Sequence, residues 1–130
     1  MLLILLTGVI EIGMGVFQDM QVQAAAEAGA LYAAKYGGSN LTAIALAVTN
    51  ATSTSGITAS PAPVLFCGCP NTSGVTSQGS NCTTVCSSGN LPGTYVTVSA
   101  KITRTELLPL PYISLGLPAT FTGTSVIRVQ

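Results

Sequence analysis

The hydrophobic positions of the chain are concentrated in one uninterrupted N-terminal run. Residues 1–17 are almost wholly apolar, and residues 18–36 continue as an alanine-rich, mildly polar stretch without proline. Because Ala, Leu, Met, Gln and Glu favour helices, the pattern predicts one long helix over residues 1–37, roughly 54 Å long at about 1.5 Å per residue. Its apolar half, about seventeen residues, is at the lower length limit of a membrane span.

We expect this apolar half to be retained in the mature protein, because it lacks the basic n-region and the small-residue cleavage site of a secretory signal. It would lie in a membrane while the second half of the helix protrudes. A buried core helix is the alternative. That alternative is weaker because residues 38–130 are too few and too polar to surround such a helix.

A second, shorter apolar stripe follows the long helix. Gly37 predicts the helix end, and Ser39 or Asn40 can cap a short helix over residues 41–52. Its apolar positions have helical spacing and comprise Leu41, Ile44, Ala45 and Val48. The Ser/Thr/Gly/Pro-rich residues 53–63 then predict a loop.

Alternating apolar and polar positions predict antiparallel strands over residues 94–105 and 121–129, and residues 64–66 predict a short strand. The apolar faces of the two longer strands comprise Val96, Val98, Ala100 and Ile102, and Phe121, Gly123, Ser125, Ile127 and Val129. The expected fold class is α+β: a long N-terminal helix (1–37) carries a head (38–130) in which a short helix packs on an antiparallel sheet.

The segment ELLPLPYISLGLPAT connects the two longer strands and is too apolar for an ordinary exposed loop. Pro109, Pro111 and Pro118 exclude a regular helix or a central strand. Exposed apolar segments usually form contacts. We expect this one to cover its own sheet edge, touch the membrane or dock against a neighbouring subunit.

The composition argues against several classes of function. Only 6% of residues are charged, basic and acidic residues are equal at 4 each, and there is no histidine. Nucleic-acid binding needs a basic patch, so the few charges argue against it. Histidine is the commonest general base and zinc ligand, so its absence argues against a catalytic or zinc site. The sequence has no nucleophile–base motif and no phosphate-binding loop, so we expect no enzyme, no cofactor and no small-molecule substrate.

The few charges also mean that the polar surface consists mainly of Ser, Thr, Asn and Gly. Such a surface tolerates close packing against copies of itself.

Glu11 is the exceptional residue of the apolar half. A carboxylate near mid-membrane costs on the order of 2.5 kcal/mol or more, so it needs a partner or a neutral form. Its neighbours three and four positions away are all uncharged: Thr7, Gly8, Met14 and Gly15. The next charges, Asp19, Glu27 and Lys35, follow at intervals of eight residues, which excludes intrahelical salt bridges. We therefore expect Glu11 to find its partner on another chain.

Small residues four positions apart let helices approach closely. Such pairs join Ala24 to Ala28, Ala25 to Gly29, and Gly29 to Ala33. The apolar half contains further glycines, and the sequence leaves undecided whether the helix unwinds locally at Gly13 and Gly15. The residues expected to serve assembly are Glu11, Gly8, Gly13, Gly15, Ala25, Gly29 and Ala33.

The 4 cysteines, Cys67, Cys69, Cys82 and Cys86, form the pattern C-x-C followed by C-x-x-x-C. Zinc sites favour paired C-x-x-C knuckles, so disulfides in an oxidising compartment are the stronger interpretation. The nested pairing, Cys67 with Cys86 and Cys69 with Cys82, and the crossed pairing, Cys67 with Cys82 and Cys69 with Cys86, are both open.

Sequons of the form N-x-S/T make Asn40, Asn50, Asn71 and Asn81 candidate glycosylation sites where the modifying machinery exists. Hydroxyl-linked sugars on the Ser/Thr-rich loops are an equal alternative.

The N-terminal segment LLILLTGVIEIGMGVFQDMQVQAAAEAGALYAAKYG resembles that of TadE-like proteins, pilin-type subunits of the tight-adherence branch of type IV pili. In both, an apolar stretch leads into an Ile-Glu pair, here Ile10-Glu11, and then an Ala-rich helix. The ending YVTVSAKI…LPLPYISLGLP…TGTSVIRVQ also resembles that family's close, with Arg128 as its terminal basic residue. Family members usually begin with a basic leader and a prepilin-peptidase cleavage point, so we expect this chain to start downstream of that region or to assemble without it.

The resemblance implies a structural subunit that polymerises through its N-terminal helix into an extracellular filament used for surface attachment. Its partners would be copies of itself and the pilus assembly machinery. It would reside in the inner membrane before assembly and at the cell surface afterwards, and Glu11 would pair with the N-terminal amine of a neighbouring subunit. The alternative is a membrane-anchored minor pseudopilin that primes or regulates a pilus made of another pilin.

Overall fold

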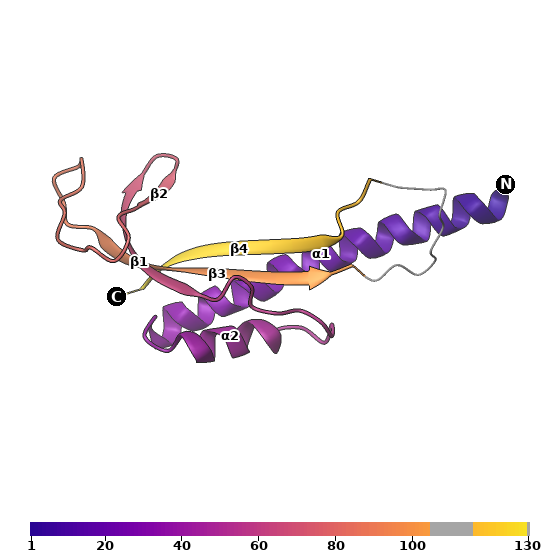
Figure 1. Ribbon diagram of the computed structural model, residues 1–130, viewed down its shortest axis with the longest axis horizontal. Coiled ribbons are helices and arrows are strands. Elements are labelled where there is room, and N and C mark those ends of the chain that lie inside the picture. The colour runs from indigo at the N-terminus through magenta and orange to yellow at the C-terminus, as the bar shows by residue number, and fades with distance from the viewer. Residues whose placement is uncertain (105–115, 130) are drawn as a thin grey trace.

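The computed structural model describes residues 1–104 and 116–129 and has the expected α+β architecture. Its elements are α1 (Leu2–Tyr36), α2 (Leu41–Thr49), β1 (Val64–Asn71), β2 (Gly74–Ser77), β3 (Gly93–Thr103) and β4 (Thr120–Val129). The strands form one antiparallel sheet in the order β2-β1-β3-β4. Strands β3 and β4 run along the second half of α1, while the N-terminal part of α1 projects beyond them (Figure 1).

Helix α1 is continuous from Leu2 to Tyr36, so the predicted long helix is confirmed and no unwinding occurs at Gly13 or Gly15. It ends where Gly37 adopts a left-handed φ of 83°, which glycine adopts without a steric penalty. The chain then reverses into α2, which Asn40 caps by accepting a hydrogen bond from the backbone N–H of Ala43 at 3.0 Å.

The core lies between α1, α2 and the inner face of the sheet. The buried positions of α1 form one side of the helix, which we call the head-facing stripe: Gly15, Gln18, Val22, Ala25, Ala26, Gly29, Ala30 and Ala33. The predicted apolar face of β3 is buried against it, as are Phe121 and Val129 of β4. From α2, Ile44 and Val48 complete the core. The alternation of apolar residues therefore predicts the inner face of both long strands correctly.

Two glycines set the distance between α1 and the head. A Cβ on Gly123 of β4 would lie 2.8 Å from the Cα of Gln23 and 2.9 Å from the carbonyl oxygen of Val22. A Cβ on Gly29 would collide with the buried side chains of Val48 and Val98. Real Cβ atoms do not approach other atoms this closely, so glycine at these positions allows the helix backbone to touch the sheet.

Several boundaries differ from the predictions. Helix α2 ends at Thr49 instead of residue 52, because the backbone N–H of Ala51 bonds to Val48, three positions back, and so departs from the helical i to i−4 pattern. Strand β1 continues to Asn71 and forms a hairpin with β2, which the turn-rich sequence did not suggest. Residues 53–63 form a loop, as predicted; Thr58 forms an isolated bridge with Lys101 of β3, and Ile57 is buried in the core.

The outer face of β3 is less exposed than alternation alone predicts. Tyr95 and Ser99 are buried there. Tyr95 stacks on Phe66 of β1 with ring centroids 5.8 Å apart, and Ser99 shares a hydrogen bond with Thr124 of β4. Most of the segment ELLPLPYISLGLPAT lies outside the described residues.

The Gly123→Ala variant tests the close approach of α1 and β4. The added methyl group meets helix backbone that cannot move aside as a side chain can, so we expect the free energy of unfolding to fall by about 1–3 kcal/mol. Gly13→Ala is the matched control, because no atom of the described residues lies within 4 Å of a Cβ built there. Denaturant unfolding of the full chain in detergent micelles, followed by circular dichroism, measures both. Equal stability of the two variants would contradict this account of the core.

Candidate assembly surface

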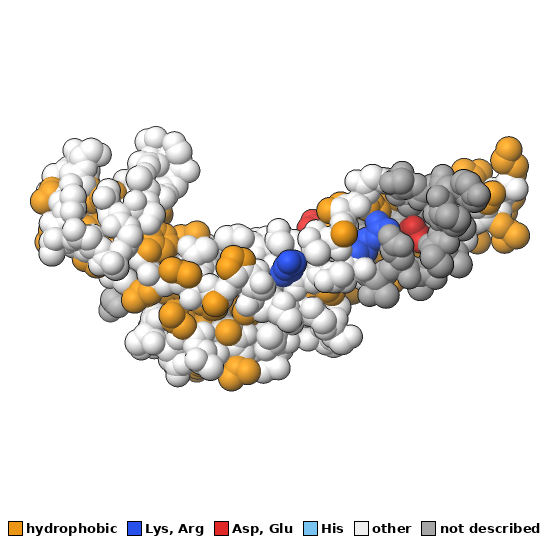
Figure 2. Space-filling view, in the orientation of Figure 1, with side chains coloured by type: hydrophobic (Ala, Val, Ile, Leu, Met, Phe, Trp, Pro, Cys, Tyr) orange, Lys and Arg blue, Asp and Glu red, His pale blue; other side chains and the backbone are white. Residues whose placement is uncertain are grey.

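The N-terminal half of α1 is an exposed apolar surface. Its large side chains are open to the surroundings on most sides of the helix, from Leu2 (78% exposed) to Phe17 (55%). Figure 2 shows hydrophobic side chains at the projecting N-terminal tip. By length and composition α1 could cross a membrane, and 11% of its most apolar 18-residue window is buried in the chain's own fold. This surface must be covered by lipid or by other apolar helices to be stable in water.

Glu11 extends the head-facing stripe into this exposed half. It lies four positions before Gly15, which in turn lies three before Gln18, so all three occupy one side of the helix. Glu11 is half-buried, and Gln18 is 8% exposed. The Oε1 atom of each is buried without a hydrogen-bond partner among the described residues. Leaving a buried acceptor unpaired costs about 1–3 kcal/mol, so both oxygens favour an additional donor.

The small residues predicted to serve assembly divide into two groups. Among the described residues, no atom lies within 4 Å of a Cβ built on Gly8 or Gly13, so no described part of the head packs closely on them. By contrast, Ala25, Gly29 and Ala33 are buried in the chain's own core, and a Cβ on Gly15 would contact Leu117 and Phe121. For this second group the predicted contact with another chain is wrong, because the small side chains pack closely against the head of the same chain.

The charged side chains of α1 beyond Glu11 are exposed. Glu27 accepts a hydrogen bond from Gln23 at 3.3 Å, and the Lys35 ammonium lies 5.2 Å from the ring centre of Tyr36. Within residues 1–104 and 116–129, neither Asp19 nor Glu27 forms an ion pair. These charges are therefore available to other molecules.

The four cysteines form two disulfides with the crossed pairing. Cys67 bonds to Cys82 and Cys69 to Cys86, with Cα–Cα distances of 5.2 and 5.6 Å. Cys67 and Cys69 are two apart in β1, so they point to the same side of the strand. The zinc interpretation is wrong because no cysteine is free. The bonds hold the segment after β2, which contributes no side chain to the hydrophobic core.

Three of the candidate glycosylation sites stabilise turns with their side chains. Asn40 caps α2. Asn71 accepts a hydrogen bond from the N–H of Ser73 and donates one to Thr76. Asn81 accepts hydrogen bonds from the N–H and hydroxyl of Thr83. Asn50 is the C-cap of α2 and is exposed, so the local structure supplies a reason for most of these asparagines apart from modification.

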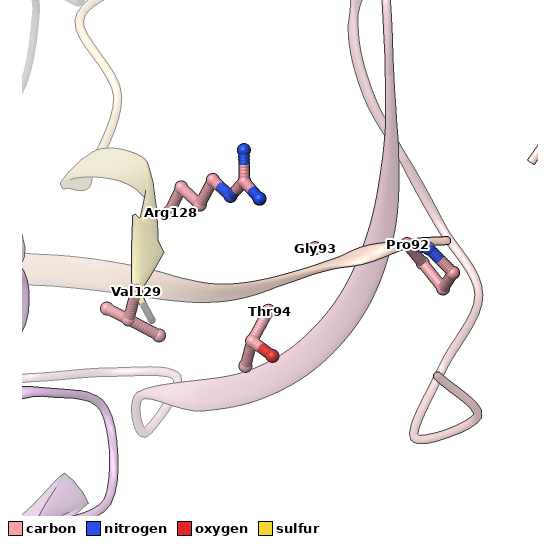
Figure 3. Close-up of a pocket in the computed structure, with 5 residues that line it drawn as sticks. All are labelled: Pro92, Gly93, Thr94, Arg128 and Val129. Atoms are coloured by element: carbon pink, nitrogen blue, oxygen red, sulfur yellow. The ribbon is translucent and has the colours of Figure 1, made fainter. Parts of the chain in front are cut away.

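Arg128 lies at a surface hollow of about 630 Å³ that the sequence did not suggest. The hollow is lined by Pro92, Gly93, Thr94, Arg128 and Val129, and Figure 3 shows the guanidinium extending beside Gly93. A Cβ on Gly93 would lie 3.0 Å from Arg128 Nε, so glycine leaves room for the arginine. Among the described residues of the lining there is no acid, thiol or imidazole.

Comparison of the chain with protein-family models, curated proteins and solved structures finds no significant match. The described residues also contain no group of three or more potential metal-ligating side chains. The geometry that bears on function is therefore the exposed apolar helix, its half-buried acid and the disulfide-bonded head.

Paired cysteine substitutions distinguish the crossed from the nested connectivity. Cys67→Ser with Cys82→Ser removes one native bond, and we expect it to lower the free energy of unfolding by about 3 kcal/mol, because a loop of this length is then no longer closed in the unfolded chain. Cys67→Ser with Cys86→Ser breaks both bonds and should cost about twice as much. Denaturant unfolding under non-reducing conditions measures both variants. The nested pairing would reverse their ranking.

Proposed function

We propose that the chain is a structural, pilin-like subunit that polymerises through its N-terminal apolar helix into an extracellular filament used for surface attachment. The observation that carries this proposal is one continuous helix with two environments. Its C-terminal half is packed into the head, whereas its N-terminal half exposes large apolar side chains. Such a helix can leave a lipid bilayer only if the apolar helices of other subunits replace the lipid.

The polar features of the helix support assembly over simple anchoring. A plain membrane anchor gains nothing from a carboxylate in its apolar half, since the charge is costly there. In a filament, a neighbouring subunit can supply the donor that the buried Oε1 of Glu11 lacks among the described residues. Gly8 and Gly13, on which no described residue packs closely, would let a neighbouring helix approach closely.

The head suits the outside of such a filament. Disulfides form in oxidising compartments, which supports a head on the non-cytoplasmic side of the inner membrane before assembly and at the cell surface afterwards. The resemblance of both chain ends to TadE-like proteins supports the same function. Copies of the chain and membrane-embedded assembly machinery would be its partners.

Glu11→Gln tests the assembly role of the acid. The amide keeps the size of the side chain but removes its charge, so we expect filaments to be lost while the head remains folded. Asp19→Asn is the matched control, because it makes the same chemical change at an exposed position of the same helix. Electron microscopy of material sheared from cells measures filaments, and circular dichroism of the detergent-solubilised chain reports folding. Normal filaments from Glu11→Gln would remove the role of Glu11.

The composition of wild-type filaments separates the two pilus roles. A structural subunit should be the main protein in sheared filaments, as measured by mass spectrometry of the intact chain. A chain that stays in the membrane fraction and is rare in filaments would instead be a minor pseudopilin that primes or regulates a pilus made of another pilin.

A further inference from the structure

The side of α1 that faces away from the head is not an ordinary solvated surface. Met20, Ala24, Glu27 and Leu31 follow one another at spacings of four, three and four residues, which places them on one line along the helix. We call them the outer stripe. Met20 and Leu31 are 65% and 66% exposed, and Glu27 is its one charged member. Helix α1 thus has two apolar stripes, of which the chain's own head covers only one.

The face of the sheet opposite the core is not covered by any helix of the described residues. The loop before β1, β1, β2 and β3 border a groove of about 290 Å³ there, lined by Pro61, Ala62, Val64, Phe66, Ser77, Thr97 and Ser99. Lys101 follows two positions after Ser99 on the same face of β3. Within the described residues Lys101 has no ion-pair partner in the chain. An apolar groove beside an unpaired cation favours an apolar side chain next to an acid.

We propose that the outer stripe of α1 docks onto the outer sheet face of a second copy of the chain, with Leu31 in the groove and Glu27 beside Lys101. This inference rests on the proposed function and specifies how the heads pack. The spacing supports it. Glu27 and Leu31 are one turn apart, about 6 Å along the helix, and Ser99 and Lys101 are about 7 Å apart along β3.

Charge distribution favours a second copy as the occupant. The acids among the described residues, Glu11, Asp19 and Glu27, all lie on α1, while the described outer face of β3 and β4 carries the cations Lys101 and Arg128 and no acid. The outer stripe also continues from the exposed apolar half of α1, so one neighbour can cover both.

The symmetry of this contact suits a filament. The outer stripe and the groove are different patches, so each chain uses one patch toward the copy before it and the other toward the copy after it. A contact between unlike patches repeats without closing when its rotation does not complete a ring, and it then produces an open helical polymer. A contact between identical patches would stop at a dimer.

A charge exchange tests the contact. Glu27→Lys and Lys101→Glu each place like charges together, so each alone should reduce the yield of sheared filaments by about tenfold or more, since like-charge juxtaposition costs several kcal/mol. The double variant Glu27→Lys with Lys101→Glu restores opposite charges and should recover most of the yield. Circular dichroism should show the same folded head in all of them, because the changed side chains lie outside the core.

Arg128→Glu combined with Glu27→Lys is the matched control, since Arg128 lies opposite Tyr95, six positions along β3 from Lys101, and does not line the groove. It should fail to restore filaments. Wild-type filaments together with unaffected single variants, or an exchange that recovers nothing, would overturn this contact while leaving the proposed function intact. Absence of the chain from wild-type filaments would overturn the structural-subunit role and this contact together.

Discussion

The structure depends on the direct contact between the backbone of α1 and the head. Dispersion forces act only between atoms in contact, and large side chains on the helix would hold the sheet away. Gly29 and Gly123 instead bring the helix against Val48, Val98 and the opposing strand, with alanines filling the remaining stripe. The head therefore packs closely against the second half of the helix, and this packing ends near Gly15.

That ending divides the helix into two environments. Before Gly15 the helix continues with the same backbone, but most of its large apolar side chains are exposed and favour contact with lipid or other helices. Glu11 lies at the boundary on the side of the head-facing stripe, where its carboxylate is half-buried. The disulfides act at the opposite end of the molecule, where they restrain a loop that has no part in the core (Figure 1).

The hydrophobic periodicity of the sequence predicted the elements well where burial of apolar side chains was the main constraint. The long helix, the start of α2 and the inner faces of β3 and β4 follow from burial at a regular spacing. It missed the β1–β2 hairpin because turn residues and cysteines hide the alternation there. It also misjudged Tyr95, which is buried by Phe66 from a strand about thirty residues earlier, a contact that no local pattern contains.

The sequence by itself determined that the chain has one long apolar helix, a low-charge head, an isolated acid at Glu11 and cysteines suited to disulfides. Those properties are local, since composition and spacing carry them. Only the tertiary structure decided the crossed disulfides and the partner of Ala25, Gly29 and Ala33. A small residue permits close packing without specifying what packs there. The reversal of the chain after Gly37 brings the head back onto the helix that carries it, and so makes these residues part of the chain's own core.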